Sequence, residues 1–96
     1  MPDKLKYEWD ENKRQRNIDE RRLDIAVLGP MVINGRNTIF FPDKRKDYGE
    51  ERWLAFGIVQ SLRLCVCFTF RRDAIRLITI YRVNKKDWEN NYGKDD

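Results

Sequence analysis

The chain has 96 residues, a length that fits one domain, which we expect to span residues 1–96. Hydrophobic residues make up 41% of it, enough to close a small core, so this composition excludes a disordered tail protein. Twenty Lys and Arg against sixteen Asp and Glu leave a net charge of +4, and no stretch is apolar enough to span a bilayer. We therefore expect a basic cytoplasmic protein with no membrane partner.

The first predicted elements are a short strand and a polar helix. Apolar Leu5, Tyr7 and Trp9 alternate with polar residues, which is typical of a strand with one apolar face. Asp10 is a good N-cap for a helix from residue 11 to about residue 22. The acid-base alternation DENKRQRNIDERR along this helix indicates either a solvated face or a surface that docks a partner protein.

A second short helix and a hairpin are expected next. Residues 23–28 are mostly apolar and predict a short helix, which Gly29 and Pro30 end. Residues 31–33 and 38–41 then read as two strands around Asn34-Gly35, because Asn-Gly supplies the positive φ values of a two-residue type I′ turn. A polar stretch containing Pro and Gly follows as an exposed loop.

The second half of the chain predicts three strands and a last helix. The strands cover roughly residues 52–59, 62–70 and 74–82, and their short connections favour an antiparallel meander. Residues 85–92 have the composition of a final helical turn or two. The whole order predicts an α+β fold in which an N-terminal strand and helices pack on an antiparallel sheet, with a short C-terminal helix.

Positive charge is concentrated in the last two strands. The run from Arg63 to Arg82, RLCVCFTFRRDAIRLITIYR, contains five arginines and one acid. Because successive side chains of a strand point to opposite faces, arginines on paired strands can share one surface that holds phosphates. This pattern indicates a polyanion partner, most plausibly RNA, although arginine is also common on exposed strands.

The register of the last strand is left open by the sequence. Strict alternation places Arg76 and Arg82 on one face and Thr79 and Tyr81 on the other, unless a bulge intervenes. Cys65 and Cys67 share a face of the preceding strand, and the chain has no histidine. These two cysteines form neither a disulfide framework nor a zinc site, so we expect no metal and no cofactor.

Three motifs resemble the BrnT family of type II toxins. They are YEWDENK at residues 7–13, GEERWLAFG at 49–57 and RDAIRLITIYRVNKKDWENNY at 72–92, in the order and spacing of that family. The resemblance implies a RelE-like fold, RNA cleavage that inhibits translation, and neutralisation by a BrnA-like antitoxin that also binds operator DNA. No helix-turn-helix pattern is present in this chain, so operator DNA should be reached only through the antitoxin.

The chain departs from the family pattern at two places. Members usually carry a Lys-His-Gly turn after the first helix, whereas this chain has Glu20-Arg21-Arg22 and therefore no histidine base. In the last strand the family typically has Ser or Thr, a small residue, Arg and Lys. Without gaps this chain has Thr79, Ile80, Tyr81 and Arg82 there, so Tyr81 stands where arginine is expected.

Metal-free RNA cleavage needs a base for the 2′-hydroxyl, a cation for the charge on the phosphorane and a proton donor for the leaving oxygen. Glu51 is the first choice of base, with Glu50, Lys13, Tyr81 and Tyr92 as alternatives; Glu51 could also merely pair with a neighbouring arginine. The candidate catalytic residues are Glu51, Arg63, Arg76, Thr79, Tyr81 and Arg82. The candidate RNA-binding residues are Lys13, Arg71, Arg72 and Lys85.

Two other functions remain open at this stage. The missing histidine and the displaced arginine favour a degenerate family member that binds its antitoxin without cleaving RNA. A plain RNA-binding module would bind RNA with strong salt dependence and release no fragments.

Overall fold

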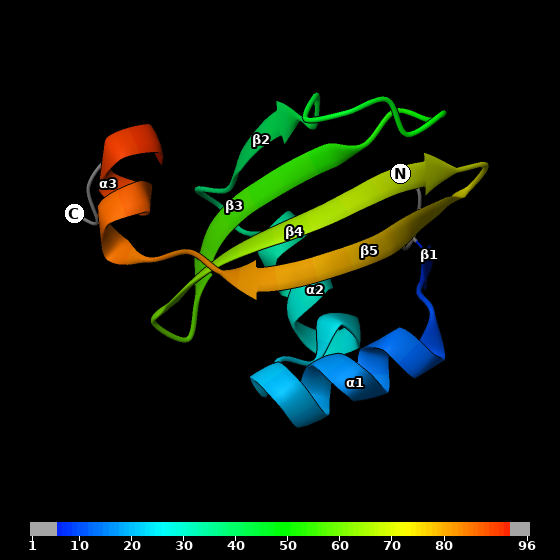
Figure 1. The fold of residues 1–96 in the computed structure, drawn as a ribbon, viewed down its shortest axis with the longest axis horizontal. Helices are drawn as coiled ribbons and strands as arrows, with labels where there is room; N and C mark the ends of the chain where they lie inside the picture. Colours follow the sequence, from blue (N-terminus) through cyan, green and yellow to red (C-terminus); the bar gives the residue numbers. More distant parts are fainter. Residues whose placement is uncertain (1–5, 93–96) are drawn as a thin grey trace.

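The computed structural model describes residues 6–92 and contains one five-stranded sheet with three helices (Figure 1). The elements are β1 (Lys6–Glu8), α1 (Glu11–Arg21), α2 (Ile25–Ile33), β2 (Ile39–Pro42), β3 (Trp53–Val59), β4 (Leu62–Arg71), β5 (Ala74–Arg82) and α3 (Lys85–Tyr92). The α+β prediction is confirmed, and so are the three-stranded meander β3–β5 and the C-terminal helix. Within residues 6–92 no helix is both long and apolar enough to cross a membrane.

The sheet is mixed because β1 runs parallel to β5. The strand order is β1-β5-β4-β3-β2, and all neighbours other than β1 and β5 are antiparallel. The predicted first strand is thus correct in place, although Leu5 lies outside the described residues. The predicted antiparallel sheet is confirmed for β2 to β5, and β1 adds one parallel strand at the edge beside β5.

Helix α1 begins and ends as its flanking residues dictate. The Asp10 carboxylate accepts a hydrogen bond from the Lys13 backbone N–H, as expected of an N-cap. Arg22 adopts the left-handed conformation with φ of 59° and donates its backbone N–H to the Ile18 carbonyl, which ends the helix. The predicted helix is therefore confirmed and stops one residue earlier than expected.

The predicted hairpin around Asn34-Gly35 is wrong. Helix α2 continues through Gly29 and Pro30 to Ile33, and β2 pairs with β3 instead of with residues 31–33. Packing explains the difference. A Cβ on Gly29 would lie 3.1 Å from a Leu77 methyl group, so a larger residue here would require the Leu77 side chain to shift by a few tenths of an ångström. Burial of the apolar helix against the sheet outweighs the hydrogen bond lost at Pro30.

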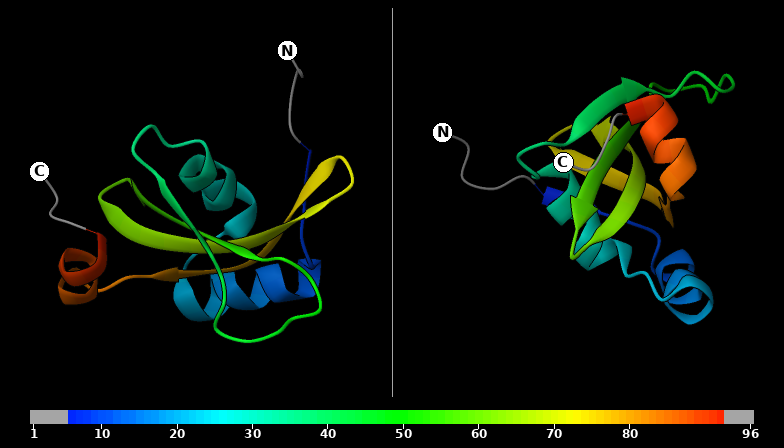
Figure 2. Two further views of the ribbon diagram at one scale, coloured as in Figure 1. Left: turned by 90° about the horizontal axis from the view of Figure 1, so that it is seen from above. Right: turned by 90° about the vertical axis from the view of Figure 1, so that its left-hand side faces the viewer.

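One face of the sheet carries α2 and the main core (Figure 2). The buried members of this core are Leu23, Ile25, Leu28, Val32, Ala55, Val59, Leu64, Val66, Phe68, Ile75, Leu77 and Ile80. The opposite face, which we call the open face, carries a smaller second core in which Trp88 of α3 packs with Phe56 and Cys65. It is bordered by α1, α3 and the segment between β2 and β3 (Figure 1). From register, its side chains include Leu54, Phe56, Arg63, Cys65, Cys67, Thr69, Arg76, Thr79 and Tyr81.

Candidate functional site

A β-bulge in β5 decides which polar side chains reach the open face. Cys67 pairs with Thr79, whereas the next residue, Phe68, pairs with Leu77, so Ile78 is an extra residue in β5. Directly paired residues share a face, and Arg76 pairs with Thr69. Arg76, Thr79 and Tyr81 therefore all lie on the open face, in contrast to the arrangement that strict alternation predicts.

A basic pocket of about 200 Å³ lies at one end of this face. Four cations from four different segments line it: Lys13 of α1, Arg52 just before β3, Arg71 at the end of β4 and Arg76 of β5. Only two acids, Asp10 and Glu50, join them, together with Leu77 and Ile78. A concave site with an excess of positive charge from converging side chains is suited to a phosphate group.

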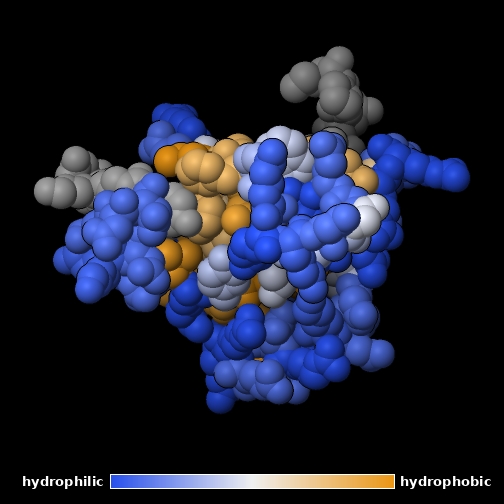
Figure 3. Space-filling view, turned by 45° about the horizontal axis from the view of Figure 1, so that its top comes forward, coloured by the Kyte–Doolittle hydropathy of each residue, from blue (hydrophilic) through white to orange (hydrophobic). Residues whose placement is uncertain are grey.

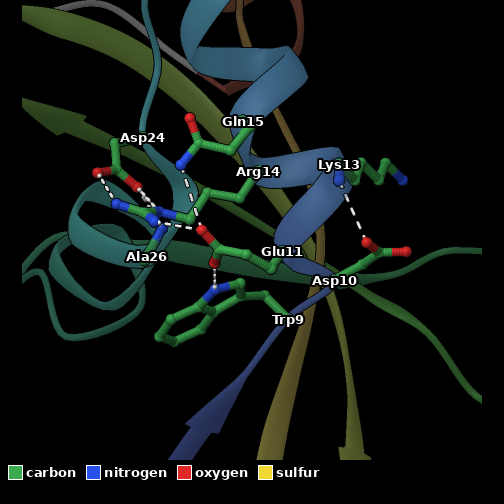
Figure 4. A network of polar contacts seen from close by, with 8 residues as sticks. All are labelled: Trp9, Asp10, Glu11, Lys13, Arg14, Gln15, Asp24 and Ala26. Carbon is green, nitrogen blue, oxygen red and sulfur yellow. Dashed lines mark hydrogen bonds and ion pairs between the residues drawn. The ribbon is translucent and has the colours of Figure 1, made fainter.

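Lys13 points toward this pocket and away from the other polar contacts of α1. Figure 4 shows its side chain extending away from the network in which Arg14 binds Asp24 and Glu11. Burial lowers the pKa of Lys13 and is the largest cause of the shift; Cys67 opposes it, and the nearby Arg52 guanidinium lowers the pKa by a lesser amount. A lysine with a lowered pKa beside arginines is a candidate for proton transfer.

Glu50, not Glu51, is the carboxylate that faces the cations. Its two oxygens bind Arg52 at 3.1 Å and Arg71 at 3.3 Å, and Arg52 is the main reason that the pKa of Glu50 is lowered. Glu51 is exposed, and its contribution is a backbone carbonyl that accepts a hydrogen bond from the Thr69 hydroxyl. Glu51 thus precedes β3 as expected, but it does not line the basic pocket.

The segment between β2 and β3 is organised around a buried carboxylate. The Asp43 side chain is 0% exposed and binds Arg45 through both oxygens at 2.8 Å. This pairing lowers the pKa of Asp43 to about 2, and a hydrogen bond from Tyr48 contributes to the same shift. Arg52 stacks on the Tyr48 ring at 4.2 Å, so the segment connects the buried Asp43 to the basic pocket.

Two thiols and a tyrosine continue the open face beyond the pocket. Cys65 pairs with Tyr81 across the strands, and a hydrogen bond joins their side chains. Burial raises the pKa of both Cys65 and Cys67 to about 11. Protonated buried thiols are poor nucleophiles, so the prediction that the cysteines are packing residues agrees with their surroundings.

Arg82 lies on the other side of the sheet. It pairs with Leu64, a core residue, and its guanidinium donates to the Arg21 carbonyl at 2.7 Å, where α1 ends. The bulge lies upstream, between Leu77 and Thr79, so it does not bring Arg82 to the position of Tyr81. The structure therefore separates Arg82 from the other candidate catalytic residues of β5.

The remaining candidates are dispersed. Arg63 is on the open face, but about 20 Å of strand separates it from Thr69 at the pocket end. Lys85 is exposed at the start of α3, and Arg72 is exposed in the turn between β4 and β5 with φ of 53°. The side chain of Tyr92 lies outside the described part of the chain. The structure thus brings together Lys13, Arg71 and Arg76, with Thr79 and Tyr81 further along the same face.

Sequence reasoning missed Arg52, Asp43 and Arg45. Arg52 lies inside the GEERWLAFG motif, so its position next to a predicted strand could have identified it as a candidate. Asp43 and Arg45 lie in a loop with several charges, and no sequence signal distinguishes a buried carboxylate there. Among residues 6–92 no group of three or more Cys, Asp and Glu side chains is arranged to hold a metal ion.

A comparison with protein families gives one match. The family model described as "Ribonuclease toxin, BrnT, of type II toxin-antitoxin system" matches residues 9–87, which is most of the chain. The matched range includes all four cations of the basic pocket and the bulge of β5. Comparisons with curated proteins and with solved structures find no match.

Proposed function

The chain belongs to the BrnT family of ribonuclease toxins of type II toxin-antitoxin systems, and from this membership we propose that its basic pocket binds the RNA phosphate at which it cleaves. The observation that carries the proposal is the convergence of Lys13, Arg52, Arg71 and Arg76 from four segments on one pocket of the open face. Family membership provides the RNA substrate and an antitoxin partner; the assignment of residues rests on the geometry.

The arginines hold the phosphate and stabilise its charge. The side chains of Arg52 and Arg76 are 26% and 32% exposed, so they are partly desolvated and already ordered by ion pairs with Glu50 and Glu8. Guanidinium groups bind phosphate oxygens through two parallel hydrogen bonds and stay charged throughout the reaction. Glu50 positions Arg52 and Arg71, and its ion pairs make it a weak base.

Lys13 is the proton acceptor in this proposal. Its neutral form takes the proton of the 2′-hydroxyl, the 2′-oxygen attacks phosphorus, and the bond between phosphorus and the 5′-oxygen breaks. Tyr81 lies four residue pairs from Arg76 on the same face, about 14 Å along the strands. At this distance it contacts a neighbouring nucleotide and not the reacting phosphate, and a water molecule supplies the proton for the 5′-oxygen. The products are a 2′,3′-cyclic phosphate and a 5′-hydroxyl.

The reaction proposed here is independent of metal ions, because the pocket cations supply the positive charge near the phosphate that a metal ion would otherwise provide. The antitoxin that neutralises this activity is of the BrnA kind, and operator DNA is bound through it. The toxin acts in the cytoplasm, where its RNA substrate is found.

The test is cleavage of a defined RNA by the purified protein in the presence of EDTA. The proposal expects 2′,3′-cyclic phosphate ends for the wild type and loss of at least about 100-fold in rate for Arg76→Ala and Lys13→Ala. Arg36→Ala is the matched control, since it removes one exposed cation outside the pocket. Normal cleavage by folded Arg76→Ala and Lys13→Ala proteins would refute the assignment.

A degenerate toxin is the second candidate function, favoured by one observation. Tyr81 occupies the position of the family arginine, and Arg82 cannot replace it because it lies on the opposite face. Such a protein would bind its antitoxin and cleave no RNA. Expression of the chain in cells without the antitoxin separates the two, because only an active nuclease arrests growth.

A further inference from the structure

Strand β2 is an apolar strand at the edge of the sheet. It pairs with β3 on one side and is the last strand in the order β1-β5-β4-β3-β2. Ile39, Phe40 and Phe41 are 40%, 45% and 39% exposed. Figure 3 shows an exposed apolar area (orange) beside α3, on the side of the molecule where β2 lies. On its outer side β2 presents the backbone N–H and C=O of Phe40 and the C=O of Pro42, and such groups can pair with another extended chain.

An apolar groove lies next to this edge on the α2 side of the sheet. It has a volume of about 360 Å³ and is lined by Ile33, Phe40, Trp53, Phe68, Phe70 and Ile75. Three of its rings form a row, with centroids of Phe40 and Phe68 6.2 Å apart and those of Phe68 and Phe70 5.7 Å apart. Phe70 is 62% exposed. The groove is therefore suited to apolar side chains of a segment that lies along β2.

The charges at the two ends of β2 indicate what kind of segment fits. Arg36 is exposed before the strand, and Lys44 and Lys46 are exposed after it. Asp43 is the one acid between Arg36 and Lys46, and its charge is already paired with Arg45 inside the protein. Both ends of β2 thus present unbalanced positive charge, and they complement an extended segment with apolar residues at alternate positions and acidic residues at its ends.

We propose that the antitoxin adds such an acidic-ended strand to the outer edge of β2 and places apolar side chains in the groove beside Phe40. This inference rests on the antitoxin partner of the family and goes beyond the ribonuclease site, because the β2 edge and the groove share no lining residue with the basic pocket. The proposed partner at this edge is one strand of the antitoxin. The alternative partners are a second copy of this chain and RNA.

Hydrogen exchange of the toxin alone and in complex with its cognate antitoxin tests the strand addition. The proposal expects the backbone amide of Phe40 to become protected in the complex, because an added strand takes up the outward-facing groups of β2. The Asp43 N–H donates to the Arg52 carbonyl, so by alternation Ile39 and Phe41 pair with β3, and Pro42 has no N–H. Unchanged exchange in β2 alongside protection elsewhere would overturn it. Protection of β2 in the toxin alone that grows with protein concentration would assign the edge to a second copy.

Titration of purified antitoxin into toxin variants tests the side chains. Phe40→Glu is expected to raise the dissociation constant by about tenfold or more, as for an anchor residue in an interface. Val27→Glu is the matched control, because Val27 is an apolar residue of α2 that is 56% exposed and does not line the groove. Equal binding by both variants would overturn the proposal. Neither measurement uses RNA. A protein that fails to cleave RNA would therefore contradict the nuclease assignment and would not affect the proposed antitoxin contact.

Discussion

Arg76 and Thr79 point to the same face of β5 although they are three residues apart, because Ile78 between them is the extra residue of a β-bulge. The bulge has two consequences. Ile75, Leu77 and Ile80 all reach the core, and Arg76 reaches the basic pocket. In a regular strand that kept Ile78, side chains would alternate strictly, so Leu77 and Ile80 could not both face the core.

Deletion of Ile78 should be tolerated, because it removes the extra residue and leaves a regular strand in which Arg76, Leu77 and Ile80 keep their faces. Deletion of Ile80 should instead remove a fully buried core residue and turn Tyr81 toward the core. We expect the first deletion to change the free energy of unfolding by less than about 1 kcal/mol and the second to reduce it by more than about 3 kcal/mol. Urea denaturation measures both. Similar losses for the two variants would show that Ile78 is not the extra residue of the strand.

Arg82→Ala should leave RNA cleavage within about twofold of the wild-type rate. The side chain lies on the face opposite to the pocket and holds the end of α1 through the Arg21 carbonyl. We expect a loss of about 1 kcal/mol in the free energy of unfolding, the usual contribution of one hydrogen bond. Cleavage rate and thermal melting are measured on the same preparation. A folded Arg82→Ala variant that no longer cleaves RNA would show that Arg82 takes part in the reaction.

Arg72→Gly separates the conformational role of Arg72 from its predicted role in RNA binding. Arg72 has φ of 53°, a conformation that costs an L-residue about 1 kcal/mol and costs glycine little. We expect the variant to melt at a higher temperature and to bind RNA with unchanged affinity, because Arg72 does not line the basic pocket. Arg22→Gly, at φ of 59°, is the control for the gain in stability. Weakened RNA binding in Arg72→Gly alone would support its RNA-binding role.

Asp43 should make stability depend on pH in the acid range. Its pKa of about 2 in the folded protein is below the ordinary value of 3.8, so the folded state favours the ionised form. This contribution is complete above about pH 4 and is lost as the pH falls toward 2. We expect Asp43→Asn to lower the free energy of unfolding at pH 7 by about 2 kcal/mol, and the difference from wild type to shrink between pH 4 and pH 2. Denaturation curves at several pH values measure this, and a constant difference would contradict it.

Cys65 and Cys67 should resist alkylation in the folded protein. Both are buried, with exposures of 0% and 1%, and burial raises the pKa of each thiol to about 11. Because the thiolate is the reactive form, iodoacetamide at pH 8 is expected to modify neither residue until denaturant is added. Mass spectrometry counts the modified sites. Rapid modification of the native protein would mean that the open face above the cysteines is more accessible than the structure indicates.

The sequence by itself determined the elements whose periodicity is local. Asp10 starts α1, and alternation of apolar residues defines β3, β4 and β5 close to their observed bounds. Prediction from the sequence was wrong where a strong local turn signal competes with the burial of apolar residues. Asn34-Gly35 has the composition of a hairpin turn but follows a helix, whereas Gln60 and Ser61, with φ of 52° and 67°, make the actual tight turn between β3 and β4. Packing of α2 on the sheet outweighs turn preference there.

The candidate site shows the same division. Strand spacing predicted a basic sheet surface formed by arginines of the last strands, and Lys13, Arg71 and Arg76 are among the candidate residues identified from the sequence. Only the tertiary structure decided that Ile78 forms a bulge, that Arg82 leaves this surface for the end of α1, and that Arg52 and Glu50 enter it from a loop. The physical reason is that a one-residue change of register reverses the face of every following side chain, and register is set by cross-strand packing between residues far apart in the chain.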